Sequence, residues 1–196
     1  MYEMSTSKRG SYHHGDLRGA LIALALEALE NDDPEAPTLR GLAEQAGVSG
    51  MAPYRHFPDK AALLEAVARQ GFAELREKLR EADDEGDPKK ALIAFGVVYV
   101  RFACARPGLF RLMFGGRPPT PGEQLADDPE TVFGLLSARI AQLAPAPRRQ
   151  IAFLACWSIV HGLASLLVGG RIRGAAAAPE DLAEQLGSVL LEGLLA

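Results

Sequence analysis

Apolar side chains recur every three or four residues along almost the whole chain, the spacing that places them on one face of an α-helix. No segment shows the strict alternation of apolar and polar residues that is typical of a half-buried strand. Prolines, glycines and acidic clusters interrupt the pattern and predict connectors at residues 31–37, 83–88, 115–129 and 174–179. The pattern therefore predicts an all-α protein with helices over residues 16–29, 38–46, 49–57, 58–82, 89–105, 109–114, 130–143, 148–168 and 180–195.

Two short predicted helices lie close together between residues 38 and 57. The apolar residues of the first follow the i, i+3, i+4, i+7 spacing of a helical stripe: Leu39, Leu42, Ala43 and Ala46. Thr38 can cap this helix, Gly47 can end it in the left-handed conformation, and Ser49 or Gly50 can cap the next one. Two short helices joined by a tight turn are typical of a helix-turn-helix, which offers its second helix to the DNA major groove.

Composition and charge modify this interpretation only a little. The chain has 196 residues, of which 48% are hydrophobic and 23% charged, as in an ordinary folded protein of one or two domains. Its net charge is −4, and residues 1–60 carry 6 Lys and Arg against 9 Asp and Glu, which argues against a general affinity for nucleic acid. Much of this acid lies at residues 27–35, away from the expected DNA face, so we give more weight to the motif.

Cysteine usage and the longest apolar stretch bear on the cellular location. Cys104 and Cys156 are far apart and no signal-like segment begins the chain, so we expect two reduced thiols in a cytoplasmic protein. Residues 151–170 contain no Asp, Glu, Lys or Arg, which meets the length criterion for a membrane span. This segment also contains His161 and three glycines, and we interpret it as a buried or dimer-forming helix.

The helix-turn-helix region resembles the DNA-binding region of the tetracycline-repressor (TetR) family of bacterial regulators. The shared motifs are Thr38, Ala46-Gly47-Val48-Ser49, Tyr54-Arg55-His56-Phe57 and Pro58-Asp59-Lys60. Residues 12–18 are similar to the start of the family's first helix, and Trp157 with His161-Gly162 resembles the Trp…His-Gly signature of one ligand-domain subgroup. The resemblance implies a helix-turn-helix domain over residues 1–57, with a disordered arm at 1–11, and a ligand-binding and dimerisation domain over 58–196.

The resemblance also implies which residues contact DNA: Thr38, Arg40, Ser49, Gly50, Met51, Ala52, Tyr54, His56 and Lys60. Tyr54, His56 and Lys60 would position the protein on phosphates, although Tyr54 could instead pack into the domain and Lys60 could be a solvated charge. The start of the second helix offers almost no side-chain hydrogen bonds, so we expect apolar readout there. Arg40 would bind guanine, or alternatively a phosphate or Glu44.

Aromatic residues gather in the C-terminal half and suggest a ligand pocket: Phe95, Tyr99, Phe102, Phe110, Met113, Phe114, Phe133, Phe153, Trp157 and His161. Such a stripe is often simply core. Trp157 and His161 are i, i+4 neighbours, however, and opposite a second aromatic face they would line an apolar pocket with a few polar groups. None of these residues carries a permanent charge, so we expect an apolar effector that is neutral at its buried end.

Small residues follow one side of the longest apolar helix and suggest a dimer interface: Ala155, Ser158, Gly162, Ser165 and Gly169. The last helix adds an apolar stripe: Leu182, Leu186, Val189 and Leu190. In TetR-like proteins the last two long helices pair with their symmetry mates, which the resemblance implies here. Packing within one subunit is the alternative.

We therefore expect a homodimeric regulator, a repressor released by its ligand from a pseudo-palindromic operator, with no membrane association, no catalysis and no cofactor. We expect no metal site either, because His13 and His14 are accompanied by no further Cys and His set. The alternatives are a dimeric scaffold that no longer binds DNA and a small helical enzyme that uses His161 as acid or base.

Overall fold

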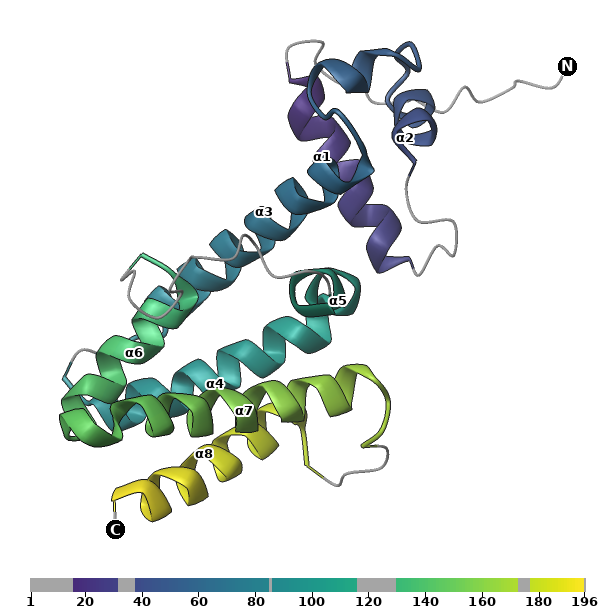
Figure 1. Ribbon diagram of the computed structural model, residues 1–196. Coiled ribbons are helices and arrows are strands. Elements are labelled where there is room, and N and C mark those ends of the chain that lie inside the picture. The colour runs from purple at the N-terminus through teal and green to yellow at the C-terminus, as the bar shows by residue number, and fades with distance from the viewer. Residues whose placement is uncertain (1–15, 32–37, 85, 116–129, 173–176, 196) are drawn as a thin grey trace, which may run out of the picture. The chain divides into compact units, whose positions relative to one another are not determined.

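The computed structural model describes residues 16–31, 38–84, 86–115, 130–172 and 177–195, and within these ranges every regular element is helical (Figure 1). This confirms the all-α prediction. The elements are α1 (Leu17–Glu30), α2 (Leu39–Gln45), the 3₁₀ helix η1 (Ala52–Arg55), α3 (Lys60–Glu81), α4 (Pro88–Ala105), α5 (Pro107–Gly115), α6 (Val132–Leu143), the 3₁₀ helix η2 (Ala146–Arg148), α7 (Arg149–Val168) and α8 (Pro179–Leu195). The predicted arm and the pair His13 and His14 lie outside the described residues.

Two compact units divide the chain between Val67 and Ala68, inside α3. In the N-terminal unit, α1, α2 and η1 pack against one another. Their buried side chains, with those of the first turns of α3, form one core: Leu21, Ile22, Ala25, Leu39, Leu42, Ala43, Pro53, Phe57, Leu63, Ala66 and Val67. The guanidinium of Arg18 on α1 also lies 5.4 Å from the centre of the Phe57 ring. The connector between η1 and α3 is thereby held against α1.

The turn after α2 confirms the predicted cap residues. The Thr38 hydroxyl accepts a hydrogen bond from the backbone N–H of Gly41 at 3.1 Å. Gly47 has a φ of +70°, and its N–H bonds to the carbonyl of Glu44 while the N–H of Val48 bonds to that of Ala43, both at 3.0 Å. These two bonds form a Schellman motif, which satisfies the last carbonyls of α2 and turns the chain towards η1.

The second helix of the motif differs from the prediction. A helix over residues 49–57 capped by Ser49 or Gly50 is wrong, because the structure has only the four-residue η1, preceded by Met51 without a side-chain cap. An α-helix capped at Ser49 needs the N–H of residue 53, and Pro53 has none. The carbonyl of Ser49 instead accepts from the N–H of Ala52 at 2.9 Å, which is 3₁₀ geometry.

In the C-terminal unit, α4 packs against α6, α7 and α8, and α7 packs against α8 (Figure 1). Small residues allow α4 and α8 to approach closely, since a Cβ added at Gly187 would lie 3.5 Å from Cγ1 of Ile93. A largely buried ion pair joins α6 to Asp83, two residues after the end of α3. Arg139 donates from Nε to Oδ1 of Asp83 at 2.7 Å and from Nη2 to Oδ2 at 2.5 Å, with only 12% and 13% of the two side chains exposed.

Candidate DNA-binding surface and ligand cavity

The residues predicted to contact DNA lie along the surface of the N-terminal unit. Arg40 is exposed in the first turn of α2, and its Cγ lies 3.9 Å from where a Cβ of Gly50 would be, so α2 and the residues before η1 present neighbouring groups. Met51 is 67% exposed and Tyr54 40% exposed. Thr38 and Ser49 are exposed as well. This strip combines the guanidinium of Arg40 with the apolar Met51 and the aromatic Tyr54.

The other residues predicted to contact phosphate lie around the start of α3 (Lys60–Glu81). His56 is exposed and Lys60 half-buried. The carboxylate of Asp59 accepts the N–H of Ala62 at 2.8 Å, so it satisfies one of the free donors of the first turn. The side chains of His56 and Lys60, more than the backbone at this helix start, are therefore the groups that suit a phosphate.

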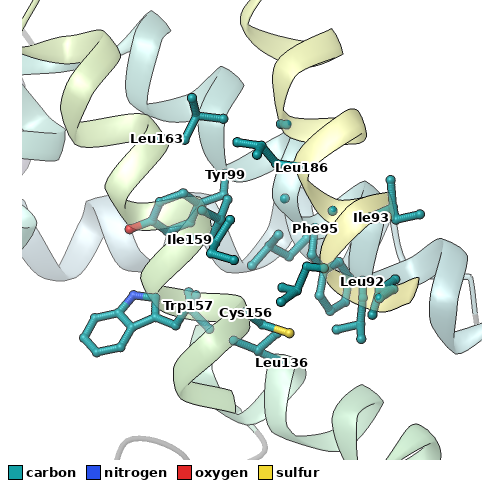
Figure 2. A pocket seen from close by; sticks show the side chains of 18 of the residues that line it. Leu92, Ile93, Phe95, Tyr99, Leu136, Cys156, Trp157, Ile159, Leu163 and Leu186 are labelled. Carbon is teal, nitrogen blue, oxygen red and sulfur yellow. The ribbon is translucent and has the colours of Figure 1, made fainter. Parts of the chain in front are cut away.

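A narrow cavity of about 70 Å³ lies between α4, α6, α7 and α8 (Figure 2). Four of the predicted pocket residues line it: Phe95, Tyr99, Phe133 and Trp157. No residue of the lining carries a permanent charge. The cavity is smaller than the space a drug-sized ligand needs, about 300–1,000 Å³, so its walls have to move apart for such a ligand to enter.

The other six predicted pocket residues lie beside the cavity or away from it. The rings of Phe110 and Phe114 are each 5.8 Å from that of Tyr99, and the rings of Phe114 and His161 are 5.1 Å apart. The ring of Phe153 lies 6.2 Å from that of Phe133 and is tilted by 55° relative to it. The remaining two face elsewhere. Met113 lies against α3, where a Cβ at Gly71 would be 2.6 Å from its Sδ, and Phe102 lines a separate, charged cavity with Glu74 and Arg101.

A polar pair crosses the aromatic cluster. The Tyr99 hydroxyl and Nδ1 of His161 are 2.8 Å apart, linking α4 to α7. Burial raises the pKa of Tyr99 far above its ordinary value and lowers the pKa of His161. Both side chains are therefore uncharged at neutral pH, so this polar pair adds no charge to the aromatic cluster.

Sequence reasoning missed most of the aliphatic lining, above all that from α8: Ala183, Gly187 and Leu191. Leu186 and Leu190, which were predicted to form the dimer interface, also line the cavity. The sequence did contain one sign of this lining. Gly96 lies in α4 and Gly187 in α8, and small residues let two helices approach closely. Cys156 lines the cavity too, and burial raises the pKa of its thiol to about 11, so it stays protonated.

The predicted interface helices expose apolar surface. Ser158, Ser165 and Gly169 are exposed, and a Cβ at Gly162 would meet no atom within 4 Å. Large apolar side chains surround them at unusual exposure: Ile151 64%, Leu154 42%, Leu166 42% and Val189 67%. The segment Ala146–Val168 is long and apolar enough to span a membrane, with only 22% of its apolar window buried. Large exposed apolar side chains on neighbouring helices are a common feature of interaction surfaces.

Comparison with known proteins identifies the family. Residues 21–67 match the model of bacterial regulatory proteins of the tetR family, and residues 92–190 match that of the tetracyclin repressor-like C-terminal domain. The chain belongs to the TetR family. It is a transcription regulator with an N-terminal helix-turn-helix DNA-binding domain and a C-terminal helical domain, which confirms the resemblance found in the sequence. Its place in the Trp…His-Gly subgroup stays a prediction.

Relatives cover both parts of this TetR-family chain. A protein of unknown function from Rhodococcus sp. RHA1 is 31% identical, with a TM-score of 0.79 over 95% of this chain and 99% of that one. A TetR variant from Acinetobacter baumannii AYE, solved with minocycline, shares the fold at 24% identity and a TM-score of 0.63 over 89% and 94% of the two chains. The nucleoid occlusion factor SlmA of Aliivibrio fischeri strain MJ11 is 30% identical over 131 residues, spanning 64% of this chain and 65% of SlmA.

Proposed function

We propose that this TetR-family regulator is a homodimeric repressor that binds a pseudo-palindromic operator and releases it when an apolar effector enters the C-terminal unit. It acts in the cytoplasm, away from membranes, by binding alone, without catalysis or a cofactor. The exposed strip of Arg40, Met51 and Tyr54 beside the Gly47 turn is the observation that carries the proposal. Two such strips in a dimer would meet successive major grooves about 34–36 Å apart.

DNA fragments from upstream of its own gene test the proposal directly. The protein is expected to retard such a fragment saturably, and more strongly than a scrambled fragment of equal length. Raising the salt from about 50 to about 200 mM should weaken this binding steeply, because phosphate contacts release counterions. Equal and weak binding to both fragments would favour the scaffold alternative.

The dimer would form through the exposed face of α7 and α8. Ser158, Gly162 and Ser165 leave room for the close approach of a second helix, and Ile151 and Val189 lose their exposed apolar surface when a second copy covers them. Leu186 and Leu190 of α8 line the cavity, and the same helix carries the exposed Val189 of the proposed interface, so the cavity wall and the interface share this helix. A change in the cavity can therefore reach the dimer contact through α8.

Coupling to DNA would run through α5. Phe110 and Phe114 on this short helix contact the Tyr99 and His161 rings, and its Leu109 and Met113 pack on Gly71 of α3. An effector that displaces the aromatic cluster would shift α5 against α3, the helix that begins at Lys60. Couplings of this kind are typically about 1–3 kcal/mol, which is about 5-fold to 150-fold in DNA affinity.

Replacing Lys60 with alanine tests the phosphate contact. We expect weaker binding to every DNA sequence by a similar factor, and a salt slope reduced by about one unit, since one fewer counterion is released. Fluorescence anisotropy at several salt concentrations measures both. Lys89→Ala is the matched control, because it removes the same charge from the exposed start of α4 in the other unit. An unchanged slope in Lys60→Ala would exclude Lys60 from the contact set.

Replacing Arg40 with alanine tests base recognition. If Arg40 binds a guanine with two hydrogen bonds, the variant should lose about 1–3 kcal/mol on the operator and lose its preference at one base pair. Competition among operators mutated at single positions locates that pair. Uniform weakening at all positions would instead make Arg40 a phosphate ligand.

A further inference from the structure

A second cavity, the α3–α4 cavity, lies between those two helices in the C-terminal unit. Its volume is about 400 Å³, whereas the apolar cavity has about 70 Å³. Drug-sized ligands occupy sites of about 300–1,000 Å³, so the α3–α4 cavity has the size of a ligand site as it stands. Its described lining consists of Glu74, Lys78, Glu81, Ala82, Val98, Arg101, Phe102, Ala105 and Arg106.

One part of this lining is apolar. Val98, Phe102 and Ala105 follow the i, i+4, i+7 spacing along α4, so they share one face of that helix, and Ala82 follows directly after α3. Val98 is half-buried and Ala105 exposed, so a ligand that covers them removes apolar surface from water. This face therefore suits a ring or a short aliphatic chain.

The other part of the lining is charged, and one pair of opposite charges is already joined. Nη1 of Arg106 lies 3.1 Å from Oε2 and 3.4 Å from Oε1 of Glu74. Nζ of Lys78 lies 3.9 Å from the same carboxylate, which is too far for a hydrogen bond. Apart from the joined pair, the described lining contains the cations Lys78 and Arg101 and the carboxylate of Glu81, an excess of one positive charge.

Lys78 and Arg101 offer donors to an added anion from opposite sides of the cavity. Arg101 on α4 uses its Nε to donate to Glu180 at 3.3 Å, and within the described residues its two terminal NH₂ groups make no hydrogen bond. Its side chain is 63% exposed, and that of Lys78 on α3 is 48% exposed. A guanidinium presents paired N–H donors that match the two oxygens of a carboxylate. An anion between these two cations would thus bridge α3 and α4.

From its size, its apolar face and its excess of cationic donors, we infer that the α3–α4 cavity is a second ligand site, which binds a small organic carboxylate with an apolar body. The carboxylate lies between Lys78 and Arg101, and the body packs on the face of Val98 and Ala105. This ligand differs in charge from the apolar effector proposed above. Binding here does not require the ligand release of DNA proposed there.

Three probes of nearly equal shape but different charge test the site: benzoate with a charge of −1, neutral benzamide, and benzamidine, which is a cation at neutral pH. Ligand-observed NMR at low salt gives their dissociation constants. An exposed ion pair changes affinity by about 1.5-fold to 5-fold, so with two cations benzoate should bind about 2-fold to 25-fold more tightly than benzamide. Benzamidine should bind most weakly, and added salt should reduce the preference for benzoate.

Single charge-removing variants should change benzoate binding in opposite directions. Lys78→Gln and Arg101→Gln should each weaken it by about 1.5-fold to 5-fold, while Glu81→Gln should strengthen it by a similar factor, because a repelling charge is lost. Benzamide should be affected little by any of them. Lys89→Gln is the matched control, since Lys89 is exposed at the start of α4 and lies outside the described lining. A general loss of structure would not strengthen binding in one variant.

Intermolecular nuclear Overhauser effects locate the bound benzoate. They should reach the methyl protons of Val98 and not the indole of Trp157, which is the only tryptophan and lines the apolar cavity. Contacts with Trp157 instead of Val98 would overturn the inference. It would equally be overturned by benzamide or benzamidine binding as tightly as benzoate, by weaker benzoate binding in Glu81→Gln, by equal effects of the Lys78 and Lys89 variants, or by no binding of benzoate at millimolar concentration.

Discussion

Gly162→Leu is expected to convert the proposed dimer into folded monomers. Within one subunit a Cβ at Gly162 meets no atom within 4 Å, so α7 has room for the longer side chain. In the proposed interface this position faces a second copy, where overpacking typically costs about 1–3 kcal/mol. Because the interface is twofold symmetric, each dimer would contain the substitution twice, and the overpacking cost would double to about 2–6 kcal/mol. The dissociation constant of the dimer should therefore rise by a factor of about 30 to more than about 10⁴. Sedimentation at several protein concentrations measures it.

The control for this variant is Gln142→Leu, which adds the same side chain to the exposed surface of α6. It should leave the dimer intact. Circular dichroism should show helical content unchanged in both variants. A Gly162→Leu protein that remains a dimer of unchanged affinity would show that the small residues of α7 do not form the interface. Because one monomer offers one half-site contact, the same variant should also bind the operator much more weakly than the wild-type protein.

Arg139→Met is expected to produce the largest loss of stability, about 3–5 kcal/mol in the free energy of unfolding. Arg139 and Asp83 bind each other through two hydrogen bonds and are nearly buried, so the variant leaves the carboxylate without its cation. The loss should fall on α6, which carries Phe133 and Leu136 into the cavity lining. Urea unfolding at fixed protein concentration measures the change, since dimerisation itself adds stability.

A surface ion pair provides the matched control for Arg139. Arg80 bonds to Glu130 at 2.6 Å, but 38% and 66% of the two side chains are exposed. Arg80→Met should therefore change the free energy of unfolding by no more than about 1 kcal/mol. The double variant with Arg139→Met and Asp83→Leu should recover most of the loss, because no unpaired charge remains buried. Equal effects of the Arg139 and Arg80 variants would contradict this role of burial.

The N-terminal unit shows how far local signals reach. Thr38 caps α2 and Gly47 ends it as predicted, because the hydrogen bonds involved join residues no more than five positions apart. The length of the next helix was wrong for a reason that is equally local. Pro53 lacks the N–H that an α-helix capped at Ser49 needs, so the proline already excludes that cap at the level of the sequence.

The cavity was harder to predict. The aromatic residues correctly predicted that α4 and α7 line the cavity. A stripe of this kind shows which face of a helix is apolar, but it does not show which other helix packs against that face. Phe95 and Tyr99 therefore line the cavity, while Phe102 on the same helix lies in a different one. The contribution of α8 went unnoticed because its leucines suited an interface equally well.

By itself, the sequence determined the helical class, the TetR-type motif and most helix ends, because these depend on periodicity and on hydrogen bonds between near neighbours. Only the tertiary structure decided the chemistry of the cavity. It brings Tyr99 within hydrogen-bond distance of His161, 62 residues later, and places Leu186 and Leu190 of α8 in the cavity wall. Contacts of that range are set by how whole helices pack, and no local pattern in the sequence records them.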